Sequence, residues 1–343
     1  MSRCEHTSWL EFIEDEGGPQ LAYGWRFQRV IEELPRPTEQ YPQITLLVGK
    51  RQKRTALGQL CENREGRHHR KSPINLRADN RSIRSTNPRF FADCDPELRE
   101  ILPAINSPKF CHRQENLAVN WPRSTPWKYY DLVLTRLLFL FVDVICVFAD
   151  DLGGLDAAKG LLMEWASIGS ASSLPVRPRV IVVHGGESCA SVTQSVLDET
   201  NFLFDLQNPS NTLFHSSFSN VRLSTLPPRE HSPGARYLQL SGDILTELCE
   251  AQQDRVENRI LFSASHLNHF FDDALEHIRS DIFTPFNFIE SSRKSNPLDG
   301  SFILHLLAFL GETIRVHTEY SAVASYIASA ILMDAYPRAM HGR

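Results

Sequence analysis

Two short runs of uninterrupted apolar residues constrain the fold of this chain more than any other feature. They are "VICVFA" at 144–149 and "VIVV" at 180–183. A strand with one solvated face alternates apolar and polar residues, so a continuously apolar strand must be covered on both faces. Helical stretches separate these strands from one another and from an earlier strand at 43–49. We therefore expect an α/β fold with a mostly parallel sheet and helices on both faces.

The strand at 43–49 leads into a segment with the layout of a phosphate-binding P-loop. "QITLLVGKRQKRTALGQL" reads as an apolar strand, a basic loop and a helix, which we expect at about 55–62. A working P-loop has the pattern GxxxxGK[ST]. Bare glycine backbone approaches the phosphates, the lysine neutralises them and the hydroxyl binds Mg²⁺. The glycines and the lysine of this chain do not fit that pattern.

Neither alignment of the segment with the motif is complete. Counted from Gly49, the last three motif positions hold Arg54, Thr55 and Ala56. Counted back from Thr55, Lys53 stands where a bare glycine is required, although Arg54 and Thr55 then keep suitable chemistry. The N-terminus of the following helix would still attract an anion. We therefore expect a degenerate nucleotide site that binds phosphate and hydrolyses nucleotide slowly or not at all.

Acidic residues at two strand ends are candidates for the Mg²⁺ that accompanies a nucleotide. Asp93 lies in "RFFADCD", and Asp150 begins the acidic pair after "VICVFA". Acidic residues in such positions also cap helices, and this alternative stays open for both. A guanine-reading Asn-Lys-x-Asp should end a later strand, which ends in "HGGE" instead, so no base is specified. The candidate nucleotide-binding residues are Gly49, Lys53, Arg54, Thr55, Asp93 and Asp150, and the expected cofactor is a purine nucleotide with Mg²⁺.

The pattern becomes helical beyond residue 232. Apolar residues recur there at helical spacing, with candidate helices at about 234–252, 254–279, 298–314 and 319–333. A chain of 343 residues also exceeds one typical core. The sequence therefore predicts three parts: an N-terminal segment at 1–39, a P-loop NTPase-like α/β domain at 40–232, and a helical region at 233–343.

Long blocks of the chain are similar to a known family. These blocks are "FFADCDP" at 90–96, the run that begins "RLLFLFVDVICVFADDLGG" at 136, "ILFSASHLNHFFDDALEHI" at 260–278 and "SYIASAILMDAYPRAMH" at 325–341. They resemble the region ahead of the phospholipase domain in large fungal patatin-like proteins. The resemblance implies a degenerate, GTPase-like regulatory module joined to an acyl hydrolase. The GxSxG of that hydrolase is absent here, so we predict no catalytic residue in this chain and expect the phospholipase domain to follow it.

Two other functions remain open at this stage. The first is a non-catalytic protein-interaction scaffold that binds no nucleotide, in which apolar helices such as "FILHLLAFLG" at 302–311 contact partners. The second is a basic surface for nucleic acid or anionic lipid, since residues 50–89 hold twelve Lys and Arg against three acidic residues. That stretch contains no aromatic residue for base stacking, which disfavours nucleic acid.

The expected location is cytoplasmic, with the nucleus as the alternative. The seven cysteines are odd in number and form no CxxC pair, which favours reduced intracellular thiols. The N-terminus is acidic and lacks the apolar stretch of a signal peptide. The apolar segment at 132–149 is long enough to cross a membrane, but it contains Arg136 and Asp143. We expect a helix followed by a buried strand there, and no transmembrane segment.

One helix face gathers several side chains that bind metals in other proteins. His266, His269, Asp273 and His277 share a face of the helix expected at 254–279. No second segment with suitable ligands accompanies them, so the sequence favours a solvated face of an amphipathic helix. We predict no metal site.

Overall fold

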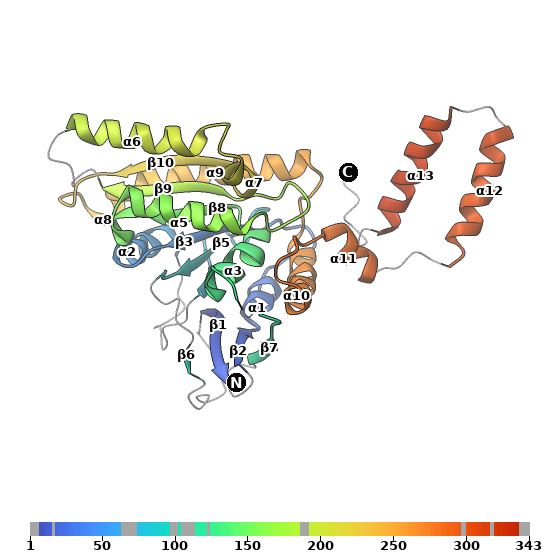
Figure 1. Cartoon of the computed structure of the whole chain (residues 1–343), viewed down its shortest axis with the longest axis horizontal. Helices are drawn as coiled ribbons and strands as arrows, with labels where there is room; N and C mark the ends of the chain where they lie inside the picture. Colours follow the sequence, from blue (N-terminus) through green and yellow to red (C-terminus); the bar gives the residue numbers. More distant parts are fainter. Residues whose placement is uncertain are drawn as a thin grey trace. The chain divides into compact units, whose positions relative to one another are not determined.

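A computed structural model provides the fold. It describes residues 7–15, 18–62, 74–96, 102–103, 114–121, 124–185, 192–295, 300–315 and 319–335. One large mixed sheet organises most of this chain (Figure 1). The protein is therefore an α/β protein, as the apolar runs predict.

Half of the sheet is parallel. Its strands lie in the order β10 (Asn220–Leu226), β9 (Arg179–Gly185), β8 (Val144–Phe148), β3 (Gln43–Val48) and β5 (Arg89–Cys94). The two apolar runs of the sequence form β8 and β9, and every residue of both strands is buried. Helices on both faces account for this continuous burial.

The other half of the sheet is antiparallel. It continues from β5 through β4 (Ile74–Ala78), β1 (Ser8–Asp15), β2 (Gly18–Gly24) and β7 (Gln114–Ala118), while β6 (Leu102–Pro103) pairs with β1 in parallel. The expectation of a mostly parallel sheet is therefore wrong. The N-terminal segment folds back as a hairpin and enters the sheet, a long-range pairing that local sequence patterns do not reveal.

Two helices cover one face of the parallel half. They are α2 (Arg51–Leu60) and α9 (Leu238–Glu257). Their apolar residues form one buried cluster with alternate residues of the strands, which include Leu47, Cys146 and Ile181. The preceding short helix α8 (Pro233–Arg236) and Tyr237 close the end of this layer.

A second group of helices builds another core. It contains α3 (Tyr129–Arg136), the 3-10 turn Leu138–Leu140, α4 (Ala149–Leu152), α5 (Leu155–Ile168), α6 (Val192–Gln207) and α7 (Thr212–Ser217). Figure 1 shows α5 crossing in front of β8 and β9. Trp165 on α5 is fully buried against Phe139, and its indole N–H donates to Asp131 at 2.8 Å. The ring contact thus holds α5 against the 3-10 turn, and the hydrogen bond holds it against α3.

The antiparallel half has its own aromatic core. Trp9 of β1 stacks on Phe27 of α1 (Arg26–Glu32), with ring centroids 5.3 Å apart. Phe271 of α10 (Ala264–Ser280) contacts both rings. These buried rings join the N-terminal hairpin to a helix more than 240 positions later in the chain, so α10 belongs to the same compact unit.

The chain divides into two compact units, Met1–Phe286 and Asn287–Arg343. This boundary lies beyond the one expected at 232, because α9 and α10 pack on the first unit. The second unit contains α11 (Phe288–Ser295), α12 (Phe302–Arg315) and α13 (Tyr320–Ala335). In the part of the chain that the structure describes, no helix is long and apolar enough to cross a membrane.

Candidate phosphate-loop site

The candidate site lies where β3 and β8 end side by side. From β3 the chain passes through α2 to the strands on one side, whereas from β8 it passes through α5 to β9 on the other side. This reversal is a topological switch point, and open α/β sheets bind ligands in the crevice at the carboxyl ends of such strands. The strand–loop–helix segment singled out from the sequence is therefore at the position where an α/β sheet binds a ligand.

The turn between β3 and α2 is very short. Only Gly49 and Lys50 separate the two elements, because α2 begins at Arg51 rather than at the expected residue 55. Gly49 has a φ of +154°. A Cβ on Gly49 would lie 2.8 Å from Oδ2 of Asp151 and 2.9 Å from Cβ of Phe148. The tight turn therefore requires glycine, but it is too short to wrap around a phosphate group as a P-loop does.

A carboxylate of the chain itself occupies the N-terminus of α2. Asp151, on α4 directly after β8, accepts the backbone N–H groups of Lys50, Arg51, Gln52 and Lys53 at 2.7, 3.1, 3.1 and 3.1 Å. These are the free amides that make a helix start attractive to an anion. Asp151 therefore takes the place that a phosphate would take in a P-loop.

Asp150 joins the same edge of the sheet. One of its oxygens accepts the backbone N–H of Gly185, at the end of β9, at 2.9 Å and the side-chain amide of Gln52 at 2.8 Å. The structure thus brings the predicted residue Asp150 to the candidate site, where it ties β9 to α2. It acts there as a hydrogen-bond acceptor within the fold.

Lys53 and Asp93 form a buried ion pair. Nζ of Lys53 lies 3.2 Å from Oδ1 of Asp93 and donates to the carbonyl of Cys94 at 2.9 Å. Arg77 pairs with the other oxygen of Asp93. Burial raises the pKa of the Cys94 thiol to about 12, against the opposing charge of Lys53. The charge of Lys53 is therefore paired within the fold, and Asp93 pairs with two cations, Lys53 and Arg77.

Two of the predicted phosphate ligands lie away from this cluster. Arg54 and Thr55 are exposed on α2, and the hydroxyl of Thr55 donates to the carbonyl of Arg51 at 3.2 Å. The prediction assumed that the helix begins at residue 55. Because α2 begins at Arg51, Arg54 and Thr55 come after its first residues. Their side chains therefore do not lie beside the N–H groups at its start.

The site therefore keeps four of the six predicted residues together: Gly49, Lys53, Asp93 and Asp150. Sequence reasoning missed Asp151, which makes the decisive contacts. The signal was present, since Asp151 belongs to the acidic pair after the apolar run. Nothing in the sequence tells which of two adjacent carboxylates faces a helix almost 100 residues away.

A buried histidine nearby has the wrong geometry for a catalytic relay. Nε2 of His184 lies 3.2 Å from the hydroxyl of Thr225 and 3.4 Å from Oε1 of Glu199. In a hydrolase triad the nucleophile and the orienting acid contact opposite nitrogens of the ring. Here both partners lie at the same nitrogen, so the arrangement orders β9, β10 and α6 and supplies no activated hydroxyl.

The expected metal-type face of α10 is divided among separate partners. His266 contacts the hydroxyl of Ser263 at 2.9 Å, His269 lies 3.7 Å from Asp273, and His277 contacts the carbonyl of Thr284 at 2.9 Å. Within the described ranges no group of three or more His, Cys, Asp or Glu side chains is arranged to hold a metal ion.

Much of the basic stretch at 50–89 is neutralised by the chain itself. Asp79, fully buried, pairs with Arg81 at 3.0 Å and with Arg89 at 2.7 Å. Lys53 and Arg77 pair with Asp93. Residues 63–73, which include "RHHRK", lie outside the described residues. Lys53, Arg77, Arg81 and Arg89 therefore belong to ion pairs within the fold, whereas Arg51, Arg54 and Arg84 are exposed.

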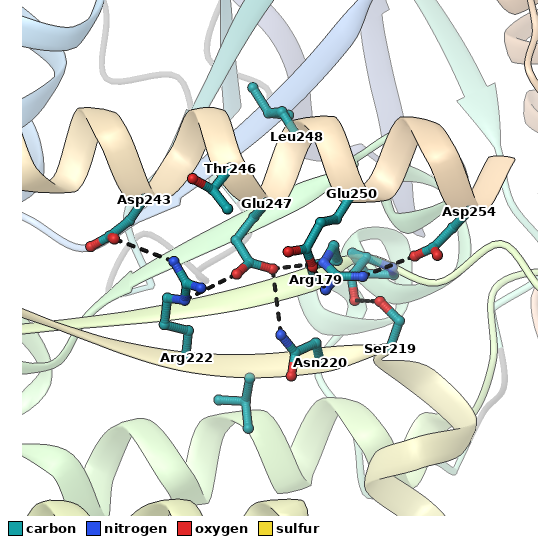
Figure 2. Close-up of polar contacts among 12 residues, drawn as sticks. Arg179, Ser219, Asn220, Arg222, Asp243, Thr246, Glu247, Leu248, Glu250 and Asp254 are labelled. Carbon is teal, nitrogen blue, oxygen red and sulfur yellow. Dashed lines mark hydrogen bonds and ion pairs between the residues drawn. The ribbon is translucent and has the colours of Figure 1, made fainter. Parts of the chain in front are cut away.

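A second polar cluster fastens α9 to the sheet (Figure 2). Arg179 donates to Glu247 at 2.6 Å and to Asp254 at 2.9 Å, and it also pairs with Glu250. Arg222 lies 3.1 Å from Glu247, which is fully buried. Burial alone would lower the pKa of Arg179, but the three carboxylates outweigh it and raise the pKa. The cluster positions a helix and leaves no group of unusual reactivity.

Comparisons with known proteins add little to this geometry. No family model and no curated protein matches the sequence. Among solved structures, the siderophore hydrolase EstA from Aspergillus nidulans is similar over 72% of this chain and 95% of its own, at 11% identity and a TM-score of 0.28. A similarity of that size carries no argument about function.

Proposed function

We propose that this chain is a non-catalytic protein-interaction module whose P-loop-like turn is closed by its own Asp151. The observation that carries the proposal is the set of four backbone N–H groups at the start of α2, all of which donate to that one carboxylate. A helix start that already holds an anion has no free amides for a second one.

A P-loop NTPase-like origin is the finer part of this proposal. Three features support it: a central parallel strand, a glycine turn directly after that strand, and a helix that starts at the topological switch point. The resemblance to the region ahead of a patatin-like phospholipase domain is consistent with such a module, and it stays a prediction.

Nucleotide binding, the leading expectation from the sequence, is disfavoured by charge. A phosphate at the start of α2 would have to displace Asp151 and would then lie beside both Asp150 and Asp151. Two like charges 4 Å apart repel by about 4 kcal/mol at the effective dielectric of a protein surface. Lys53, the nearest buried cation on α2, is already paired with Asp93. A purine nucleotide with Mg²⁺ remains a prediction that the closed turn makes costly.

Apolar helices supply the interaction surface in this proposal. On α12, Ile303, Leu304 and Leu307 expose 66%, 69% and 59% of their surface. Tyr320 and Tyr326 on α13 are also exposed. Contiguous exposed apolar side chains of this kind mark contact sites for other molecules.

A thermal-shift series tests whether the turn is closed. We expect no change in the melting temperature of the wild-type chain with GTP, GDP, ATP or ADP at millimolar concentration, with or without Mg²⁺. A nucleotide present at a hundred times its dissociation constant would stabilise the fold by about 2.7 kcal/mol, which the method detects easily. The Asp151→Ala substitution opens the helix start, so the same series is measured on that variant. The matched control is Asp156→Ala, which removes an exposed acid on α5. A Mg²⁺-dependent shift in the wild-type chain overturns the proposal.

A further inference from the structure

We draw no further inference here: the strongest candidate, the patch of exposed apolar side chains that α12 and α13 carry in the second compact unit, adds nothing to the function proposed above, because nothing in the structure shows what covers it.

Discussion

The carboxylate of Asp151 accepts the backbone N–H of Lys53 at 3.1 Å, although the two residues are 98 positions apart in the chain. Lys53 in turn directs its ammonium group to Asp93 on β5, at 3.2 Å. The same residue therefore offers its backbone to one carboxylate and its side chain to another. These contacts connect the ends of three neighbouring parallel strands through the first turn of α2.

Removing the carboxylate of Asp151 should destabilise the fold. Asp151→Ala leaves four N–H groups of α2 without their acceptor, and the loss of a helix cap costs about 0.5–2 kcal/mol. We expect a value near the upper end, measured as the free energy of unfolding in urea. Asp156→Ala removes an exposed acid on α5 and should change that free energy much less. Equal losses in both variants would show that Asp151 is not the cap.

A side chain at Gly49 should be tolerated poorly. Gly49→Ala places a methyl group within 3 Å of Asp151 and Phe148 at a φ of +154°. Strain of this kind costs on the order of 1–3 kcal/mol, before the displacement of Asp151 is counted. We expect a lower melting temperature and a weaker cap.

The matched control for this change is Gly160→Ala. Gly160 lies inside α5 with open space around it, so alanine should stabilise the chain by about 0.5–1 kcal/mol. The prediction fails if both alanine variants shift the melting temperature in the same direction.

Glu247 should be the most sensitive residue of α9. Glu247→Gln keeps the volume but removes the charge that faces Arg179 and Arg222. Breaking a buried ion pair from one side is strongly destabilising, and we expect a loss of about 3 kcal/mol. Glu257→Gln, at the exposed end of the same helix, should cost little. Chemical denaturation of both variants measures the difference between their losses of stability. If Glu247 had only a steric role, that difference would vanish.

Acid should weaken the contribution of Asp281. The backbone N–H of Phe283 donates to Asp281 at 2.8 Å, and this bond lowers the pKa of the carboxyl. A lowered pKa in the folded state adds stability above the unfolded pKa of about 3.9, and that stability is lost as the pH falls through the folded pKa. Asp281→Asn should therefore be less stable than the wild-type chain at pH 6, and the gap should narrow as the pH falls below the unfolded pKa. A gap that stays constant over this range of pH would contradict the linkage.

The sequence predicted the buried strands because their cause is local. The apolar runs of β8 and β9 require cover on both faces, wherever the covering helices lie in the chain. The segment at 132–149 likewise forms a helix, a 3-10 turn and a strand, with buried Arg136 donating to the carbonyls of Ser170 and Ile168. A charge in an apolar run thus indicated a core segment.

The site was harder to predict because it is built from distant parts. The P-loop pattern suggested a long loop and a helix from residue 55, whereas α2 starts at Arg51 once Asp151 supplies its cap. Such a cap has no local signature. The pairing of the N-terminal hairpin with β4 also depends on residues far apart, namely Ser8 with Asn75 and Leu10 with Ile74.

The distant cap of α2 has a consequence for the order of folding. Most helices carry their capping residue at their own start, and their first turn forms as soon as the local chain collapses. The start of α2 is instead capped by Asp151, about 100 residues later in the chain. Closing a loop of that length costs chain entropy before the contacts that it allows are formed. We therefore expect the first turn of α2 to gain protection from hydrogen exchange only after β8 has joined β3, late in the folding reaction.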